Sequence, residues 1–354
     1  DFYCIYDFRG LGGFLCSCFP NQSKPRHVSQ LAGNLASVGP ALHHVHGRAA
    51  DEPRPVGLDI GHHRPVEVCA GEVGAGDRRA GEIGLGQFRV ASVGFAEDGA
   101  GNTSLRAAIM EANALSGADT IMLGADTYTL SLTGTNEDAA VTGDLDISSD
   151  VTIVGMGADE TIIDADGIDR VFDIAFGGDA TVSDLTVQNG GNVTQGGGIR
   201  VTGGAAGGQL DLDNVKVENN SATINGAGIF SDGVISLTDV EISGNTTSGT
   251  GGGLSNDEQT TLTGVTISGN SAADGGGIYN SNQGNLLELT NVTVSGNTAT
   301  ANGGGIYTAE LVKLTNVTLT SNLGGGGIYS TGGQGDVQLK NSILANNIGG
   351  NSNL

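Results

Sequence analysis

Residues 287–297 read Leu-Glu-Leu-Thr-Asn-Val-Thr-Val-Ser-Gly-Asn, and the chain then reaches Gly-Gly-Gly-Ile at 303–306. Apolar and polar side chains alternate through this stretch, which predicts two short strands with one buried face and a turn at Asn291. Glycine and asparagine tolerate backbone conformations that other residues avoid, so Gly296-Asn297 and the glycine triplet mark further corners. With the strand that follows the triplet, the pattern predicts three short strands joined by tight corners.

This unit recurs through the second half of the chain. Its last strand ends in an asparagine, and six such asparagines are separated by 25, 25, 27, 25 and 25 residues. A glycine-rich triplet followed by Ile or Leu precedes each of them, as at 226–229 and 251–254. The asparagines are Asn220, Asn245, Asn270, Asn297, Asn322 and Asn347.

A period of about 25 residues with three strands matches one coil of a parallel β-helix, whose coils stack about 4.8 Å apart. We predict an all-β, right-handed, single-stranded parallel β-helix of the pectate-lyase type with about nine coils, in which the asparagines stack as an amide ladder. A leucine-rich horseshoe lacks its LxxLxL pattern here, and propeller blades need units of about 40 residues.

The chain consists of parts with different compositions. All His, Pro and Cys residues lie in the first 69 positions, and residues 91–354 carry six basic against thirty acidic residues, which accounts for the net charge of −24. We predict that residues 1–90 are disordered or not part of the native fold. Residues 91–125 are expected to form an N-terminal cap with a helix at 104–115, and residues 126–354 the β-helix, truncated at its C-terminus.

The cap carries a resemblance to known proteins. Residues 98–113 read Asp-Gly-Ala-Gly-Asn-Thr-Ser-Leu-Arg-Ala-Ala-Ile-Met-Glu-Ala-Asn, in which Ser104 can cap the helix. The segment resembles the CSLREA signature of bacterial β-helix proteins, with Thr103 for Cys and Ala107 for Glu. The later repeats resemble those of the polymorphic outer-membrane proteins, with Ile, Val or Leu in place of Phe. Over residues 95–354, the resemblance implies a bacterial, exported, surface-attached protein, with adhesion as the usual function.

Composition excludes some classes of partner. An acidic surface does not neutralise phosphates, so nucleic acid is not an expected partner. No apolar run reaches the roughly 20 residues of a membrane-spanning helix. We expect a secreted or cell-surface, monomeric protein whose partner is an extracellular polysaccharide or a host or neighbouring cell surface. No cofactor is predicted, although the acidic surface leaves Ca²⁺ binding open.

Two functions are considered for such a chain. The preferred one is a non-catalytic adhesin-like or structural module, and the alternative is a polysaccharide lyase or glycoside hydrolase. Catalysis needs clustered carboxylates with a basic partner, and one acidic segment offers them, although a polar turn between irregular coils is the preferred explanation. Its residues are Asp164, Asp166, Asp169, Arg170 and Asp173.

Two outward rows suggest binding without catalysis. Tyr279, Tyr307 and Tyr329 follow the glycine triplets at equivalent positions, so they are expected to stack outside the coils. They form either a glycan-stacking platform or a self-stacking ladder that stabilises the coil edge. A threonine-rich face includes Thr266, Thr293 and Thr318. Such an array could bind ice or a crystalline polymer, although exposed strands favour threonine for other reasons.

Overall fold

The computed structural model describes residues 103–349 except 136–137, 176, 204–206, 282–285 and 332–336, together with the backbone of three earlier strands. The chain divides into two units, Asp1–Gly71 and Glu72–Leu354. In the first unit, β1 (Phe2–Arg9) and β2 (Gly13–Pro20) pair as an antiparallel hairpin. Apart from these strands and β3 (Gln87–Ser92), the prediction for residues 1–90 falls outside the described residues.

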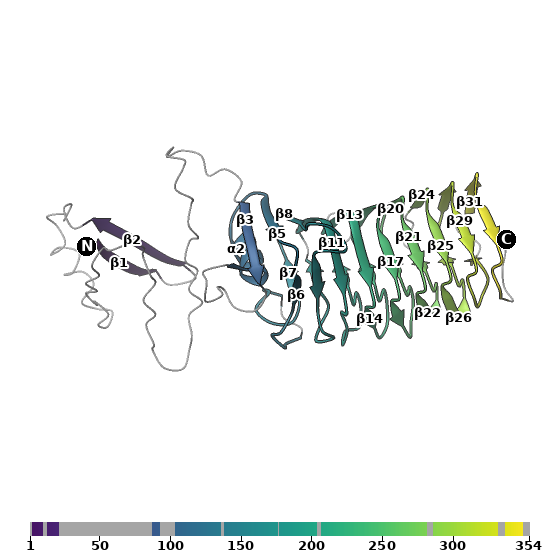
Figure 1. The fold of residues 1–354 in the computed structure, drawn as a ribbon, viewed down its shortest axis with the longest axis horizontal. Coiled ribbons are helices and arrows are strands. Elements are labelled where there is room, and N and C mark those ends of the chain that lie inside the picture. The colour runs from purple at the N-terminus through teal and green to yellow at the C-terminus, as the bar shows by residue number, and fades with distance from the viewer. Residues whose placement is uncertain are drawn as a thin grey trace. The chain divides into compact units, whose positions relative to one another are not determined.

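The second unit is a parallel β-solenoid. Figure 1 shows its strands following one another from α2 towards the C-terminus. Eight three-residue strands pair in parallel, each one coil further along the chain, and we call them sheet one. They are β7 (Leu145–Ile147), β10 (Phe172–Ile174), β12 (Ile199–Val201), β15 (Ile229–Ser231), β19 (Leu254–Asn256), β23 (Ile278–Asn280), β27 (Ile306–Thr308) and β30 (Ile328–Ser330).

The structure has about eight coils against the nine predicted. The difference arises at the N-terminal end, because the early strands β5 (Asp119–Leu123) and β6 (Thr127–Thr129) pair with no strand of sheet one. The predicted fold is otherwise confirmed.

Sheet two is formed by two strand positions in each coil. Residues with positive φ, such as Asn291 (φ 56°) and Asn316 (φ 57°), separate the two positions. The earlier position holds β8 (Val151–Val154), β16 (Val234–Thr238), β20 (Thr260–Thr263), β24 (Leu287–Thr290), β28 (Val312–Thr315) and β31 (Val337–Lys340). The later position holds β9 (Ile162–Asp164), β17 (Glu241–Ser243), β21 (Thr266–Ser268), β25 (Thr293–Ser295), β29 (Thr318–Thr320) and β32 (Ile343–Ala345). The longer strands β11 (Asp179–Gln188) and β13 (Gln209–Glu218) run through both positions.

A third, smaller sheet closes the coil beyond the asparagine corner. It consists of β14 (Ser221–Ala222), β18 (Thr246–Thr247), β22 (Ser271–Asp274) and β26 (Thr298–Asn302). Side chains that face inward from sheets one and two form one apolar core, in which Ile267, Leu289 and Val294 are fully buried. The thin aliphatic interior is continuous because each coil covers the next.

The six repeat asparagines form one hydrogen-bonded ladder inside the solenoid. The Asn270 side-chain oxygen accepts bonds at 3.0 Å from the backbone N–H and from the side-chain amide of Asn245. The Asn270 amide in turn donates to the side-chain oxygen of Asn297 at 3.0 Å and to the carbonyl of Ile242 at 2.9 Å. The same contacts recur from Asn220 onward, so every buried amide in the ladder is satisfied.

In the described part of the chain one α-helix, α2 (Leu105–Ala114), lies at the N-terminal side of the solenoid, as predicted. The Ser104 hydroxyl accepts a hydrogen bond from Ala107 N–H and so caps the helix. Leu105 and Ile109 are fully buried in the common core, and α2 contacts β3, β5 and β7. The helix therefore covers apolar surface of the first coils.

Candidate functional site

The middle residue of every sheet-one strand belongs to one outward row. In β10, Phe172 and Ile174 are fully buried in the core, so Asp173 between them faces outward. The register of the parallel strands extends this position along the whole sheet. We call the resulting set the sheet-one row: Asp146, Asp173, Arg200, Phe230, Ser255, Tyr279, Tyr307 and Tyr329. It begins with charged residues and ends with tyrosines.

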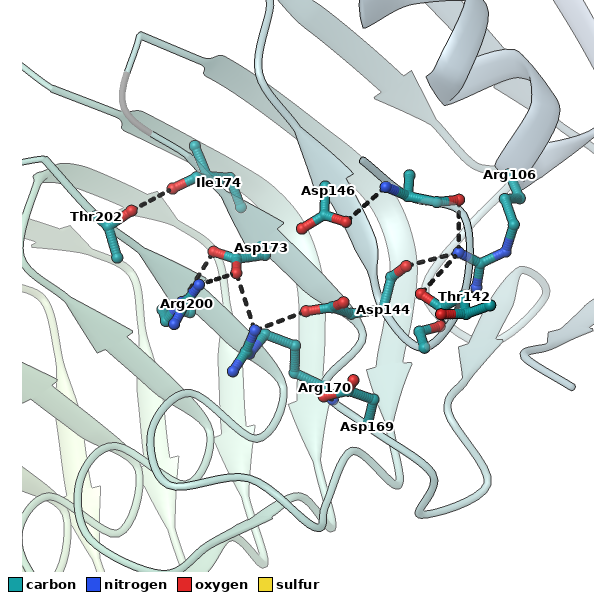
Figure 2. Close-up of polar contacts among 12 residues, drawn as sticks. Arg106, Thr142, Asp144, Asp146, Asp169, Arg170, Asp173, Ile174, Arg200 and Thr202 are labelled. Atoms are coloured by element: carbon teal, nitrogen blue, oxygen red, sulfur yellow. Dashed lines mark hydrogen bonds and ion pairs between the residues drawn. The ribbon is translucent and has the colours of Figure 1, made fainter. Parts of the chain in front are cut away.

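At its charged end, the row meets neighbouring residues in a buried ionic network. The Asp173 carboxylate accepts hydrogen bonds from Arg170 Nη1 and Arg200 Nε, each at 2.9 Å, and a further one from Arg200 Nη2. Arg170 Nη1 also donates to Asp144 at 2.7 Å. The side chains of Asp144 and Asp173 are each only 2% exposed. Figure 2 shows Arg170 between the two carboxylates and Arg200 on the other side of Asp173.

Arg106 of α2 holds the loop that precedes β7 and ends at Asp144. Its guanidinium donates to the carbonyl oxygens of Ala140 (2.9 Å), Gly143 (2.5 Å) and Asp144 (2.7 Å). The Ala140 N–H then donates to the Asp146 carboxylate at 2.6 Å. Because Arg106 is buried and these three bonds go to backbone oxygens, it positions the cluster (Figure 2).

The structure brings together only part of the predicted acidic segment. Asp169, Arg170 and Asp173 lie in the network, where the Asp169 carboxylate accepts the Arg170 N–H at 2.8 Å. Asp164 instead accepts bonds from Gln188 and Asn189. Asp166 is exposed at a turn with φ 50°, and its N–H donates to Asp164. The predicted set is therefore two separate groups, one of which is a polar turn.

Sequence reasoning missed Asp144, Asp146 and Arg200 as members of the network. Arg200 was recognisable, because it occupies the same repeat position as the tyrosines. Asp144 and Asp146 precede the regular repeats. Asp144 reaches the cluster through its hydrogen bond with Arg170, 26 positions away, and Asp146 through the pairing of β7 with β10. No local pattern in the sequence reports such contacts.

Burial shapes the protonation of this cluster. Burial raises the pKa of Asp144 to about 7, against the lowering effect of Arg170, and the negative charges of Asp169 and Asp173 raise it further. Burial also raises the pKa of Asp169. At Arg200, burial lowers the pKa, but the hydrogen bond and charge of Asp173 outweigh it and raise the value. Near neutral pH, Asp144 thus exchanges a proton while Arg200 stays charged.

The folded-state pKa of Asp144 makes a testable contribution to stability. Since that pKa lies above the unfolded value, the folded state holds a proton that the unfolded state releases between about pH 4 and pH 7. The free energy of unfolding should therefore fall as pH rises through this window, by at most about 1.4 kcal/mol per pH unit for this group. Urea unfolding across the window should show a shallower slope for Asp144→Asn than for the exposed control Asp150→Asn. Equal slopes in the two variants would contradict this assignment.

Three carboxylates of the region could in principle hold a cation. Oxygens of Asp138, Asp146 and Asp173 lie within 4.8 Å of one another. However, both oxygens of Asp173 already accept bonds from Arg170 and Arg200, and Ca²⁺ generally takes six to eight oxygen ligands. These residues therefore fit a Ca²⁺ site poorly.

At the other end of the row, the tyrosines stack on one another. The ring centroids of Tyr279 and Tyr307 are 4.7 Å apart with an interplanar angle of 15°. Those of Tyr307 and Tyr329 are 5.3 Å apart at 25°. The facing ring surfaces are closed to a ligand by this stacking, whereas the rings remain half-exposed at their edges. Burial raises the pKa values of Tyr279 and Tyr307, so both hydroxyls stay protonated at neutral pH.

Comparisons with known proteins agree with this architecture. The family model of the right-handed β-helix region matches residues 171–350, about half of the chain. The chain belongs to this right-handed β-helix family. Among solved structures, a mutant of the PL6 family alginate lyase AlyGC is similar at 14% identity with a TM-score of 0.38, over 77% of this chain and 39% of the lyase chain.

The chain thus spans well under half of the lyase's length, and a likeness this distant says nothing about activity. No curated protein matches the chain. Among the residues that the structure describes, no helix has the length and apolar character needed to cross a bilayer.

Proposed function

We propose that this chain is a non-catalytic β-helix module of an exported, surface-attached protein, adhesin-like or structural, that binds glycans along its outward rows. The observation that carries the proposal is the ion pairing of both arginines in the charged cluster. Arg170 and Arg200 both donate to Asp173, which is almost completely buried. A lyase needs a free base and a group that neutralises the substrate carboxylate, and paired cations supply neither readily.

The remaining lysines of the described coils support the same proposal. Lys216 pairs with Asp159, and Lys313 pairs with Glu288 at 3.0 Å. Lys340 is exposed in β31, near the last described coil. Among the described residues, none of these lysines lies in another cluster of carboxylates like the one around Asp173. Export and surface attachment rest on the resemblance of residues 95–354 to bacterial surface proteins and on the acidic composition, which keeps an extracellular protein soluble.

Absence of turnover is the direct test of the proposal. The purified protein should release neither unsaturated nor reducing ends from alginate, pectate or neutral polysaccharides during prolonged incubation. A glycan array with the same preparation should show retention. Product release that rises with protein concentration would overturn the proposal.

A polysaccharide lyase or glycoside hydrolase is the second candidate, and one observation favours it. Asp144 has a pKa of about 7 beside Arg170, which is the range of an efficient general acid or base. If this candidate holds, Asp144→Asn abolishes product release while the far-UV circular dichroism spectrum stays unchanged. The two candidates therefore differ in whether the wild-type protein releases cleavage products from polysaccharides.

The tyrosines provide the aromatic contact expected for soluble glycans. Replacing Tyr279, Tyr307 and Tyr329 together by Ser removes every ring edge and hydroxyl of the stacked set. Retention on a soluble-glycan array should fall at least tenfold, because aromatic surface dominates contacts with sugar rings. Exchange of the exposed Thr246 in sheet three for Ser is the control. Unchanged retention would assign the tyrosines to coil stability alone.

A further inference from the structure

A regular uncharged array of hydroxyl groups covers three successive strands at the later position of sheet two. In β21, β25 and β29, the central residues Ile267, Val294 and Leu319 are fully buried, so the residues on either side face outward. The strands pair in register without a shift. We call the six outward residues the hydroxyl face: Thr266, Ser268, Thr293, Ser295, Thr318 and Thr320.

Most hydroxyls of this face have no hydrogen-bond partner among the described residues. Thr320 contacts the adjacent Ser321 hydroxyl at 3.4 Å, whereas the side chains of the other five residues make no hydrogen bond within the described part of the chain. Each hydroxyl offers one donor and two acceptor positions. In the sheet-one row, by contrast, the Asp173 carboxylate accepts bonds from Arg170 and Arg200, and the Asp146 carboxylate accepts the Ala140 N–H. The hydroxyl face therefore has more free hydrogen-bonding capacity than the charged end of the sheet-one row.

Geometry makes the array regular in two directions. Parallel strands place equivalent residues about 4.8 Å apart between coils, and alternate residues of one strand lie about 6.6 Å apart. The β-branched threonine side chain is stiff at χ1, so its methyl and hydroxyl groups keep fixed directions. Such a face presents alternating donors, acceptors and apolar patches on a fixed grid.

Charge selects the class of ligand. The chain carries a net charge of −24, yet none of the six residues is charged. Next to the face, Glu288 is paired with Lys313, and Glu241, which pairs in register with Thr266 one coil earlier, adds a negative charge at the edge of the face. Acidic polymers are repelled by the rest of the surface, whereas a neutral polymer is not. Neutral polysaccharides carry repeating hydroxyls and apolar C–H patches, which complement those of the grid.

We propose that the hydroxyl face binds the surface of an ordered neutral polysaccharide. This inference deepens the proposed glycan-binding function and rests on it. Single hydroxyl bonds to a solvated ligand are weak, so binding depends on many of them forming together. Only a ligand with a repeating surface provides that, which distinguishes this face from a site for single sugars.

The test is a sedimentation assay with microcrystalline cellulose and chitin, compared with alginate-coated beads and soluble oligosaccharides. Wild-type protein should bind the crystalline polymers and should not bind alginate-coated beads. The triple variant with Thr266, Thr293 and Thr318 replaced by Val keeps shape and strand propensity but loses three hydroxyls. The fraction bound to the crystalline polymers should fall at least tenfold in this variant.

A matched pair of single substitutions checks the location of the binding surface. Thr293→Lys places a charge in the centre of the face and should also reduce binding at least tenfold. Thr246→Lys, the same exchange at an exposed position of sheet three, should leave binding unchanged. Unaltered binding by the triple Val variant, or adsorption of wild type to ice without binding to either crystalline polymer, would overturn the inference.

The outcomes also separate this inference from the proposed function. If the protein binds soluble glycans but its binding to crystalline polymers does not depend on the hydroxyl face, only the inference about this face is contradicted. Release of cleavage products removes the non-catalytic function, whatever the sedimentation assay shows.

Discussion

Replacing Asn270 by Ala is expected to lower the free energy of unfolding by about 4 kcal/mol, because several buried polar groups lose their partners at once. Asn270 lies in the middle of the ladder and is 1% exposed. Its side chain accepts from the backbone N–H and the amide of Asn245, and it donates to Asn297 and to the carbonyl of Ile242. Water cannot readily replace these bonds inside the coil. Urea unfolding followed by circular dichroism measures the loss.

Asn291→Gly is the matched control for this experiment. Asn291 is exposed, has φ 56° and accepts one hydrogen bond at 3.0 Å from Asn316. Glycine adopts this conformation easily and stands at the equivalent position one coil earlier, at Gly264 (φ 70°). The control should cost less than about 1 kcal/mol. A similar small cost for Asn270→Ala would show that the ladder contributes little.

The second large effect is expected at Asp173. Asp173→Ala removes the carboxylate that pairs with both Arg170 and Arg200 and leaves two guanidiniums with fewer partners in a mostly buried network. Breaking such a buried pair by removing one partner typically costs about 3 kcal/mol or more. The same substitution removes a negative charge that raises the pKa of Asp144, so that pKa should fall. Urea unfolding and carboxyl titration by NMR measure the two results.

An exposed ion pair is the appropriate comparison for Asp173. Lys313 and Glu288 lie 3.0 Å apart with side chains that are each 41% exposed. Lys313→Ala should therefore change stability by less than about 1 kcal/mol. Equal effects of Asp173→Ala and Lys313→Ala would mean that the buried network adds no stability.

The regular part of the fold could be predicted from sequence because each coil repeats the same local sequence pattern. Alternation around Val292 and Val294, positive-φ residues at Asn291 and Gly296, and the spacing of Asn297 from its equivalents determine strands, corners and register together. Six copies of one pattern make each assignment nearly independent of distant contacts. The helix at the N-terminal side could likewise be predicted from its N-cap, Ser104, and from the apolar face of the residues that follow.

The charged cluster could be predicted only in part. Asp169, Arg170 and Asp173 are neighbours in sequence, so their proximity follows from the local chain. Asp144 joins them only because β7 pairs with β10 and because Arg106 holds its loop. A second polar ladder was also missed: Asn256 donates to Asn280 at 2.9 Å, and Asn280 donates to Thr308 at 3.2 Å. Its members differ in residue type, so no single-letter repeat marks them.

The central structural claim is that successive repeats are successive coils of one solenoid, and distances between spin labels test it most directly. Cys4, Cys16, Cys18 and Cys69 would be replaced by Ser, and nitroxide labels placed at Glu218 with Ser268, Ser295 or Thr320, all in one outward column. Because these pairs are two, three and four coils apart, electron–electron double resonance should give distances that increase by about 4.8 Å per coil. Distances that do not increase in this order, or that increase by a much larger step, would contradict the stacked solenoid.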